Sequence, residues 1–395
     1  MISYEEACRL IEHHVTSRGA EMVELQHAAG RRLADDVTAR VCSPPFDKAA
    51  MDGYAVREED VRELPAVLTQ VGEVFAGGCV ERSIGPNQCA RIATGAPVPP
   101  GADMVVMQEH TEELSDNRVR IKKLSGGNIC RRGEDVQAGE VVLSAGQLLD
   151  HLHVGVAGAA GHGQLRVYKR PSVALLCTGE EVMEPGDDIR DGHIFNANGP
   201  ILRSLFQNLG YTPQYLGTVG DSRDELETVM TAGLKHDILI ITGGVSVGPY
   251  DLVPETLDAQ GVETIFHRWK VKPGKPVFFG HRGNTCVIGL PGNPLSVFVS
   301  FHLVVRQALL AMEGAEGDIP EFQSGRITEG VSDKARRRSF APCRVTTYNG
   351  ENLVIPLPYH GSADIASSAS ADAFFTLPEG CTGIEEGELV HYFEV

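Results

Sequence analysis

Hydrophobic positions near the start of the chain repeat with the period of a helix. Ala7, Ile11 and Val15 recur at intervals of four residues, which places them on one helical face. Ser3 and Glu6 stand just before this run at the spacing of a capping box, in which side chains satisfy the free amides of the first turn. The pattern predicts that the chain opens on an amphipathic helix.

The period changes further along, where short apolar runs alternate with turn residues. From about residue 54 to 143, runs such as 66–68 and 104–106 are rich in β-prone residues and are separated by Gly-Gly, Pro-Pro and Asn turns. This texture predicts a mostly β module. A glycine- and alanine-rich stretch over 154–163, followed by Arg170-Pro171, indicates a boundary before the next pattern.

Beyond Ser172, apolar strand patterns alternate with helical patterns. Strands are predicted at 173–176, 238–241 and 286–288, and helices at 201–209, 226–234 and 295–312. Such alternation is typical of a doubly wound α/β domain with a parallel sheet. After Pro320 the pattern is β again, and Asn349-Gly350 between two β-prone runs predicts a hairpin in a small C-terminal β domain.

Composition restricts the class of protein. The chain has 395 residues, of which 42% are hydrophobic and 22% charged, so we expect a globular protein of two to four domains. Its nine cysteines include no C-x-x-C pair, no apolar run approaches the roughly 20 residues of a membrane span, and no signal-peptide pattern opens the sequence. We therefore expect a cytoplasmic protein. The net charge of −18 disfavours nucleic acid, so any phosphate site must be local.

The strand ends of the α/β domain carry the candidate chemistry, because ligands of open α/β sheets bind beyond the carboxyl ends of the strands. After the strand at 238–241 come Gly243 and Gly244, whose backbone could approach an anion, and Ser246, which adds a hydroxyl donor. Taken alone, this loop is more often only a tight turn. Lys270, Lys272 and Lys275 surround a Pro-Gly turn; anion binding and a solvated lysine turn are equally plausible readings.

One further turn and three carboxylates are expected at the same edge. Pro291 to Pro294 open the long helix, where backbone amides could meet an anion or simply form a turn. Glu181, Asp221 and Asp251 follow strands, and carboxylates beside a phosphate site suggest a hard cation such as Mg²⁺. For Asp221, which precedes a helix start, an ordinary N-cap is a strong alternative.

Four further features, each taken alone, are assigned to structure and not to a site. Asp52-Gly53 is a turn pattern and Thr94-Gly95 a loop pattern. The basic run at 334–338 is short and lacks interleaved aromatic residues, so we expect a solvated loop. The sole tryptophan, Trp269, is expected to pack against a strand.

Together these segments resemble the MoeA family of molybdopterin molybdenumtransferases, which also includes the E domain of animal gephyrin. P-P-F-D-K-A-A-M-D-G-Y-A, T-G-A-P-V-P, G-G-V-S-V-G, K-P-G-K-P and L-P-G-N-P occur in the family's order and approximate spacing. Any one motif says little, but five in order are highly specific. The resemblance runs nearly end to end; Ala49, where many relatives have Ser or Thr, and Cys130 are departures from it.

The resemblance implies an α/β multidomain fold with four domains. A discontinuous N-terminal α/β linker domain would take residues 1–44 and 143–171, and an inserted mostly β domain residues 45–142. A MogA-like molybdopterin-binding α/β domain would take 172–318, and a small C-terminal β-barrel domain 319–395. The implied assembly is a homodimer in which residues of the inserted domain act on the partner's MogA-like domain.

The implied reaction inserts molybdate into the dithiolene of adenylylated molybdopterin and releases AMP, assisted by Mg²⁺ or Zn²⁺. Position by position, the family's catalytic set falls on Asp52, Thr94, Glu181, Asp221 and Asp251, of which Glu181, Asp221 and Asp251 would hold the metal. The substrate- and anion-binding set falls on Gly243, Gly244, Ser246, Lys270, Lys272, Lys275, Pro291 and Pro294, with Arg132 as an addition.

Implied partners are a MogA-like molybdopterin adenylyltransferase and molybdoenzyme apoproteins or their chaperones, with no nucleic acid and no membrane. Two other functions stay open. One is a scaffold of the gephyrin type, and the other an enzyme that only binds or adenylylates the pterin. The complete acidic and lysine set favours catalysis over the scaffold, and Asp52 and Thr94 on a separate module disfavour the simpler enzyme.

Overall fold

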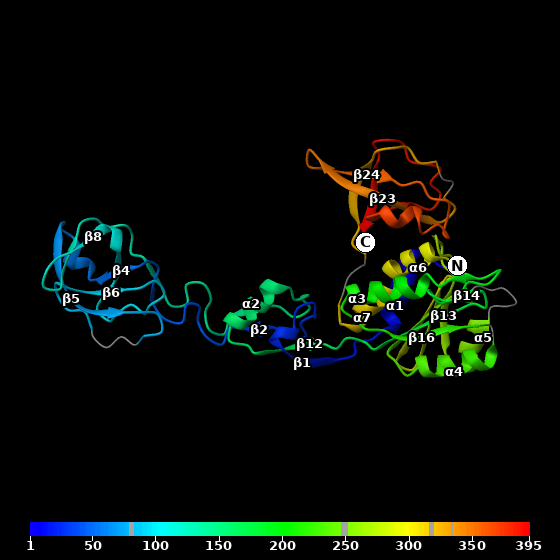
Figure 1. The fold of residues 1–395 in the computed structure, drawn as a ribbon, viewed down its shortest axis with the longest axis horizontal. Coiled ribbons are helices and arrows are strands. Elements are labelled where there is room, and N and C mark those ends of the chain that lie inside the picture. The colour runs from blue at the N-terminus through cyan, green and yellow to red at the C-terminus, as the bar shows by residue number, and fades with distance from the viewer. Residues whose placement is uncertain (79–82, 221, 246–251, 316–319, 333–334) are drawn as a thin grey trace. The chain divides into compact units, whose positions relative to one another are not determined.

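The computed structural model describes residues 1–78, 83–220, 222–245, 252–315, 320–332 and 335–395 (Figure 1). The chain divides into two compact units. The large unit comprises Met1–Glu21 and Tyr168–Val395, and the small unit comprises Met22–Val167. The four predicted domain boundaries stay a prediction.

A six-stranded sheet forms the centre of the large unit. Its order is β16-β13-β17-β21-β20-β18. The first four strands are parallel to one another, as the alternating pattern predicted, whereas the pairings of β20 with β21 and with β18 are antiparallel. The strands are β13 (Val173–Thr178), β16 (Gln214–Val219), β17 (Ile238–Thr242), β18 (Glu263–His267), β20 (Phe278–Arg282) and β21 (Thr285–Leu290). A short parallel pair, β14 (Val182–Met183) with β15 (Ile194–Phe195), follows β13.

Helices cover both faces of this sheet because successive strand residues point to opposite sides. Ile238 and Ile240 pack with α1, α3 and the α6–α7 run, whereas Leu239 and Ile241 pack with α4 and α5. The helices are α1 (Tyr4–His14), α3 (Asn198–Asn208), α4 (Arg223–Gly233), α5 (Leu252–Ala259), α6 (Pro294–Ser300) and α7 (Arg306–Met312), the last two joined by the π-helical segment η4 (Phe301–Val305). The predicted cap of α1 is present, since Ser3 accepts the Glu6 N–H at 3.1 Å.

The run from α6 to α7 is the most apolar helix of the described residues. Pro294–Met312 is long and apolar enough to cross a membrane by length and composition alone. However, 78% of its apolar window is buried inside the protein, where it packs on the sheet. Its composition is therefore accounted for by the core of the large unit.

A closed five-stranded barrel forms the C-terminal part of the large unit. β23, β24, β22, β26 and β25 pair in that order, and β25 closes on β23. The strands are β22 (Gln323–Ile327), β23 (Arg338–Tyr348), β24 (Glu351–Pro356), β25 (Ala373–Leu377) and β26 (Leu389–Glu394), and β19 (Val271–Lys272) adds to β23. Asn349 and Gly350 form the predicted hairpin turn, with φ of 49° and 82°. Phe340, Phe374 and Phe393 belong to the same core as the α/β domain.

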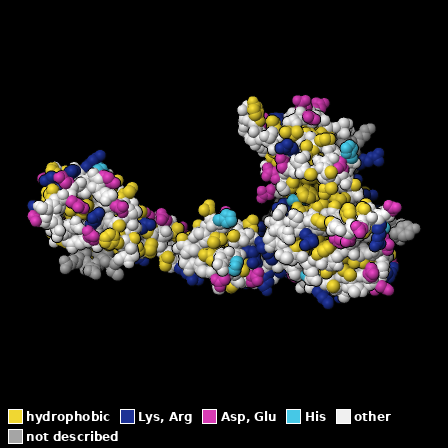
Figure 2. Space-filling model, in the orientation of Figure 1, with side chains coloured by type: hydrophobic (Ala, Val, Ile, Leu, Met, Phe, Trp, Pro, Cys, Tyr) yellow, Lys and Arg dark blue, Asp and Glu magenta, His cyan; other side chains and the backbone are white. Residues whose placement is uncertain are grey.

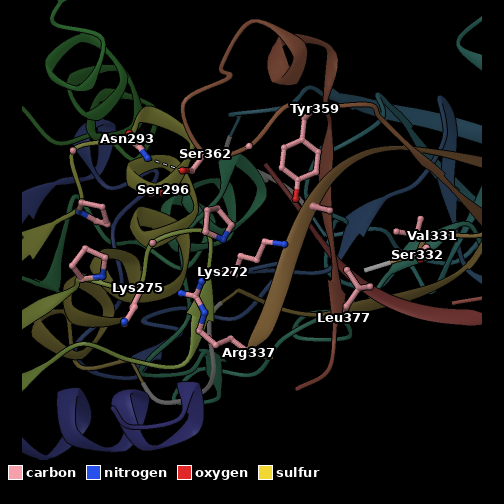
Figure 3. A pocket seen from close by; sticks show the side chains of 17 residues that line it. Lys272, Lys275, Asn293, Ser296, Val331, Ser332, Arg337, Tyr359, Ser362 and Leu377 are labelled. Carbon is pink, nitrogen blue, oxygen red and sulfur yellow. Dashed lines mark hydrogen bonds between the residues drawn. The ribbon is translucent and has the colours of Figure 1, made fainter. Parts of the chain in front are cut away.

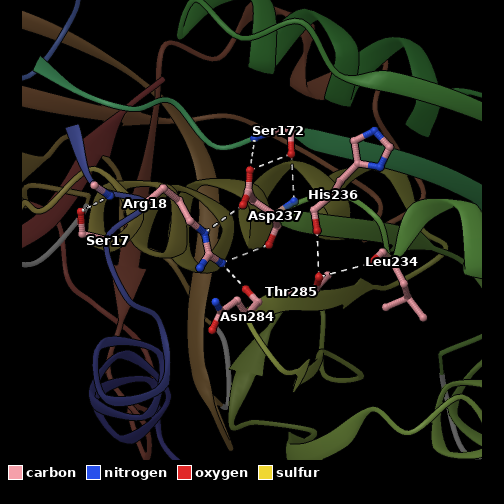
Figure 4. Close-up of polar contacts among 9 residues, drawn as sticks. Ser17, Arg18, Ser172, Leu234, His236, Asp237, Asn284 and Thr285 are labelled. Atoms are coloured by element: carbon pink, nitrogen blue, oxygen red, sulfur yellow. Dashed lines mark hydrogen bonds and ion pairs between the residues drawn. The ribbon is translucent and has the colours of Figure 1, made fainter. Parts of the chain in front are cut away.

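At the amino end of the sheet, a polar network fastens the N-terminal segment to the strands (Figure 4). Asp237 accepts hydrogen bonds from Ser172 N at 2.8 Å and Ser172 Oγ at 2.7 Å. Its other oxygen lies 3.2 Å from Arg18 Nε, and Arg18 also donates to the carbonyls of Asp237 and Asn284. One carboxylate thus links β13, β17 and the segment after α1.

The small unit is mostly β, as predicted. Its main sheet has the order β7-β4-β6-β5-β9-β8. These strands are β4 (Gly53–Val56), β5 (Ala66–Val74), β6 (Gln88–Ile92), β7 (Met104–Met107), β8 (Thr111–Glu113) and β9 (Arg118–Ile121). The shorter pairs join β3 (Lys48–Ala49) to β10 (Ile129–Cys130), β2 (Val37–Thr38) to β11 (Val141–Leu143) and β1 (Ala20–Glu24) to β12 (Gln164–Tyr168).

Five short segments complete the elements. The small unit has one α-helix among its described residues, α2 (His151–Ala159). The 3-10 turns are η1 (Leu25–His27), η2 (Glu58–Val61), η3 (Gln108–His110) and, in the barrel, η5 (Ser367–Ser370). On the face drawn in Figure 2, acidic and basic side chains are interspersed.

Candidate functional site

A cavity of about 730 Å³ lies in the large unit, between two turns of the α/β domain and loops of the barrel (Figure 3). Lys272, Lys275 and Arg337 line it, and its described lining includes no Asp or Glu. On a chain of net charge −18, three basic side chains on the wall of one cavity form a local concentration of positive charge. The cavity therefore suits an anion.

The turn that carries Lys272 and Lys275 is fixed from beneath. The fully buried Trp269 donates its indole N–H to the Gly274 carbonyl at 2.6 Å. Gly274 has a φ of +96°, and a Cβ there would lie 2.9 Å from Ser300 Oγ. Only glycine fits this position. The packing role predicted for Trp269 is confirmed, and its effect is to hold the two lysines on the cavity wall.

The second predicted turn, which contains Pro291, is tied to the end of β17. Asn198 donates to Thr242 Oγ1 at 2.9 Å and to the Gly292 carbonyl at 2.8 Å. The Thr242 hydroxyl in turn donates to the Pro291 carbonyl at 3.1 Å. Pro291 lines the cavity, whereas Pro294 is the first residue of α6 and is not part of the described lining.

The barrel completes the start of α6. The Leu295 N–H donates to the Ser362 carbonyl at 3.1 Å, and Asn293 Nδ2 donates to Ser362 Oγ at 2.7 Å. The Leu295 N–H therefore already has an acceptor within the protein and does not bind an anion. The side chains of Asn293 and Ser362 remain at the cavity, where they add polar contacts to the cations.

The solvated loop predicted for the basic run is wrong for Ala335, which is buried, and for Arg337 and Arg338, while Lys334 lies outside the described residues. Arg337 is half-buried in the cavity wall and donates to the Val271 carbonyl at 2.8 Å. Arg338 donates to Glu5 at 2.7 Å and lies over the rings of Tyr4 and Phe322. The sequence shows the charges, but not that β23 begins there against β19.

Lys270 is not brought together with the other two lysines. Its Nζ lies 3.0 Å from Glu379 Oε1, in a separate cavity of about 200 Å³ that Arg338 and Glu5 also line. Burial lowers the pKa of Arg337, and no comparable carboxylate faces that guanidinium among the described lining of the larger cavity. The candidate anion-binding site thus gathers two of the three predicted lysines and one arginine that the sequence did not indicate.

The paired glycines after β17 have a structural requirement of their own. Gly243 and Gly244 have φ of +91° and +60°, and a Cβ on Gly243 would lie 2.3 Å from the Thr178 carbonyl oxygen. The N–H of Gly243 donates to the Leu290 carbonyl at 3.2 Å, so it is not free for an anion. Ser246, predicted as a further donor, lies outside the described residues.

Glu181 is the one member of the predicted metal set that the structure describes. It is exposed just past β13, with its Oε2 folded over Gly179, 3.0 Å from where a Cβ would stand. Asp221 and Asp251 lie outside the described residues. Across the part of the chain that is described, no group of three or more His, Cys, Asp or Glu is arranged to hold a metal.

In the small unit, the structure brings Asp52 and Thr94 together. Asp52 Oδ1 accepts the Thr94 N–H at 2.7 Å and the Thr94 hydroxyl at 2.9 Å. These two bonds and the charge of Arg91 lower the pKa of Asp52. Gly53 is required beside it, since a Cβ would lie 1.9 Å from the Val106 oxygen. The pair is exposed and available to a ligand.

Arg132 takes part in this region through its backbone. Its N–H donates to Asp47 Oδ1 at 2.8 Å, and Arg131 Nη1 donates to Asp47 Oδ2 at 2.7 Å. Both bonds lower the pKa of Asp47. Asp47 thus anchors the strand that leads to Asp52, which is a structural reason for the first aspartate of the P-P-F-D-K-A-A-M-D-G-Y segment.

Comparison with known proteins places all of these motifs in one family. Residues 2–161 match the MoeA N-terminal region (domain I and II), residues 174–311 a probable molybdopterin binding domain, and residues 324–395 the MoeA C-terminal region (domain IV). Molybdopterin molybdenumtransferases of Staphylococcus aureus (strain Mu50) and Bacillus subtilis (strain 168) are 33% and 32% identical over 98% of this chain, and over 94% and 93% of their own.

A solved structure of a MoeA protein shares the fold of this chain. The molybdopterin biosynthesis MoeA protein of Pyrococcus horikoshii is 30% identical, with a TM-score of 0.85 over 100% of this chain and 99% of its own. The expected fold class, a MogA-like α/β domain with further β domains and a C-terminal barrel, is confirmed. The chain belongs to the MoeA family.

Proposed function

We propose that this protein is a molybdopterin molybdenumtransferase, which inserts molybdate into the dithiolene of adenylylated molybdopterin and releases AMP. The relatives carry that name over nearly their full length. The observation in this chain that carries the proposal is the cavity that Lys272, Lys275 and Arg337 line together. Molybdate is a tetrahedral dianion, and charge-assisted hydrogen bonds from ammonium and guanidinium groups bind such oxygens strongly.

The neighbouring polar groups complete an oxyanion site. The side chains of Asn293, Ser296 and Ser362 line the same cavity and can donate to the molybdate oxygens that the cations leave. Because Trp269 and the buried turn hold the lysines in place, little reorganisation is needed when the anion binds. The Tyr359 and Leu377 side chains form the opposite wall.

A divalent metal, Mg²⁺ or Zn²⁺, completes the proposed chemistry. Glu181 fits the role of a ligand because its carboxylate is exposed at a strand exit, and Asp221 and Asp251 are proposed with it. When bound, the metal supplies neutralisation of charge on the phosphate being cleaved. Glu181 itself would orient the metal-bearing phosphate end of the substrate, while the lysines hold molybdate.

Asp52 and Thr94 are proposed to act on the active site of a second copy in a homodimer. Their shared hydrogen bonds keep Asp52 ionised and oriented. A surface that supports the dimer is α2, where Ala157 is the one buried residue and Leu152 is 79% exposed. A cytoplasmic location is proposed with it, as are a MogA-like adenylyltransferase and molybdoenzyme apoproteins or their chaperones as partners.

The test incubates purified protein with adenylylated molybdopterin, molybdate and Mg²⁺ and follows AMP release and reconstitution of a molybdoenzyme. Asp52→Ala and Asp251→Ala should abolish AMP release and leave the fold intact. Unchanged turnover in both would remove the catalytic assignment. Absence of AMP release by the unaltered protein would remove the function.

The anion site has its own test. Lys272→Gln should raise the molybdate concentration for half-maximal rate by roughly 10-fold or more, because a charge-assisted bond of about 1.5–3 kcal/mol is lost. Lys270→Gln is the comparison, since Lys270 pairs with Glu379 in the other cavity and should change that concentration less than twofold. Equal effects of the two substitutions would contradict the proposed site.

A further inference from the structure

A polar cluster at the edge of the sheet connects the segment that carries Glu181 to a neighbouring strand and helix. Glu184 lies three residues after Glu181, and its Oε1 accepts from three side chains. Asn196 donates at 3.1 Å, and the hydroxyls of Tyr215 and Thr218 also donate. Asn196 lies between β15 and α3, and the two hydroxyl donors belong to β16, so one carboxylate joins three segments.

The cluster is closed on its other side by the first turn of α3. Asn196 Oδ1 accepts the Gly199 N–H at 2.9 Å, and Asn196 Nδ2 lies 2.9 Å from Tyr215 Oη. A Cβ on Gly199 would stand 3.0 Å from Asn196 Nδ2 and 3.2 Å from Tyr215 Oη. Glycine at this place in the helix therefore leaves room for the cluster.

Backbone bonds carry this anchorage to Glu181. The Glu181 carbonyl accepts the Ile194 N–H at 2.8 Å, and the Met183 carbonyl accepts the Asn196 N–H at 2.7 Å. At the other end, the Gly179 N–H donates to the Val219 carbonyl at 3.1 Å. The exposed Glu181 thus sits on a segment that is fastened to β16 on one side and to the Glu184 cluster on the other.

The protonation states of Glu184 and Tyr215 keep the hydrogen bonds of the cluster formed. Burial alone would raise the pKa of Glu184, but hydrogen bonds from Thr218, Tyr215 and Asn196, with the charge of Arg203, outweigh burial and lower it. The carboxylate therefore stays ionised at neutral pH and keeps accepting. Burial and Glu184 raise the pKa of Tyr215, so this phenol keeps its proton and keeps donating.

We propose that Glu184 is a positioning residue for the molybdenumtransferase reaction, which fixes the direction of Glu181 without touching the substrate. The inference rests on the proposed function, because it assigns Glu184 a role through the carboxylate that orients the phosphate end of the substrate. A misplacement of about 1 Å in a reacting group can cost roughly 100-fold in rate. Loss of the hydrogen bonds to Glu184 should therefore lower kcat more than it changes KM.

The experiment compares Glu184→Ala, Glu184→Gln and Asp188→Asn in the full chain. Asp188 is exposed on the same segment, so Asp188→Asn removes one negative charge as Glu184→Gln does and serves as the matched control. Glu184→Ala should lower kcat for AMP release roughly 10- to 100-fold with KM within twofold. Glu184→Gln should recover kcat to within about threefold, because its amide oxygen accepts from the same donors.

A second readout is independent of activity. The amides of Ile194 and Asn196, whose bonds hold the segment, should exchange with solvent at least 10-fold faster in Glu184→Ala and at the unaltered rate in Asp188→Asn. A kcat for Glu184→Ala within twofold of the unaltered protein, a change confined to KM, or unaltered exchange would each overturn the proposal. If the unaltered protein released no AMP, the proposed function would fail, while exchange would still decide whether Glu184 holds the segment.

Discussion

At the scale of single residues, Tyr54 shows how burial and one carboxylate act on the same group. Its phenol donates to Glu113 Oε1 at 2.8 Å, and burial first, then Glu113, raise the pKa of Tyr54 from 10 to about 12. A raised pKa favours the folded state while the group is protonated, so this stabilisation is complete below pH 10 and is lost as pH rises towards 12.

The measurement is a titration of tyrosine absorbance with pH. We expect a component near pH 12 that is absent in Tyr54→Phe. Glu113→Gln should move it only part of the way towards pH 10, because burial is the larger cause. Glu112→Gln is the control, since Glu112 instead pairs with Arg120 and Lys122. A component near pH 12 that persists unchanged in Tyr54→Phe would contradict the assigned environment.

Residues whose role depends on their immediate neighbours in sequence were predictable. Ser3 caps α1 and Asn349 takes a left-handed turn because the chemistry of each acts within three or four residues. Arg337 was not, because its position depends on a strand pairing between segments more than sixty residues apart. The approach of Asp52 to Thr94, 42 residues apart, was implied only by the resemblance to a family.

At the scale of elements, the close contact between β4 and β7 depends on a glycine at position 53. A methyl group on Gly53 would lie 1.9 Å from the Val106 oxygen and 2.8 Å from its carbonyl carbon. Gly53→Ala should therefore force these strands apart at a cost of about 3 kcal/mol, the upper end for overpacking. Hydrogen exchange over 53–56 and 104–107 should report the loss.

The control is Gly72→Ala on β5, where nothing lies within 4 Å of the added Cβ. That substitution should be neutral within about 1 kcal/mol or slightly stabilising, because alanine loses less backbone freedom on folding than glycine. Similar destabilisation by both would show that the close approach of Val106 does not decide the cost.

The network at the amino end of the large sheet gives a second prediction for elements. Asp237→Ala removes two hydrogen bonds from Ser172 and the partner of Arg18, a side chain that is 11% exposed. We expect a loss of about 2 kcal/mol, mostly from the hydrogen bonds, because the Asp237 side chain is 37% exposed and its ion pair is screened by solvent.

Urea unfolding followed by tryptophan emission measures this loss, since the one tryptophan, Trp269, is fully buried in the large unit. Asp258→Ala, an exposed residue of α5, should leave the midpoint within experimental error. A midpoint for Asp237→Ala equal to that of Asp258→Ala would mean that the network adds nothing to the large unit.

Elements followed from the sequence where a periodic run was long. The strand at 238–241 and the helix at 295–312 were predicted and confirmed, because each buries nearly every residue on the face its period predicts. The pair β14–β15 and the antiparallel pair β18–β20 at one end of the sheet were not predicted. Each strand of the first pair is two residues long, and the second pair is defined by its pairing. The Glu184 cluster lies at the first of these, which is why no motif indicated it.

At the scale of the whole molecule, the order of five motifs along the chain predicted the family and the fold class, both confirmed. What the motifs could not give was the cavity, since its walls come from turns near 272 and 291 and from barrel loops near 337 and 362. The barrel meets the α/β domain through Phe340, Phe374 and Phe393. Tertiary packing of this kind brings cations together that are distant and unremarkable in sequence.

The proposed homodimer leads to the last prediction, because Leu152 and Val156 of α2, and Leu148 just before it, are exposed apolar side chains among the described residues. Leu152 is 79%, Leu148 55% and Val156 40% exposed, and burying one leucine side chain contributes about 1.5–3 kcal/mol. Leu152→Glu should place a charge in each of two symmetric contacts and dissociate the dimer into 42.5 kDa chains in sedimentation. Leu389→Glu on the barrel, 63% exposed in the single chain, should leave the sedimenting mass unchanged. If Asp52 acts on a partner copy, Leu152→Glu should also lose AMP release, and a dimer that survives the substitution would place the contact on another surface.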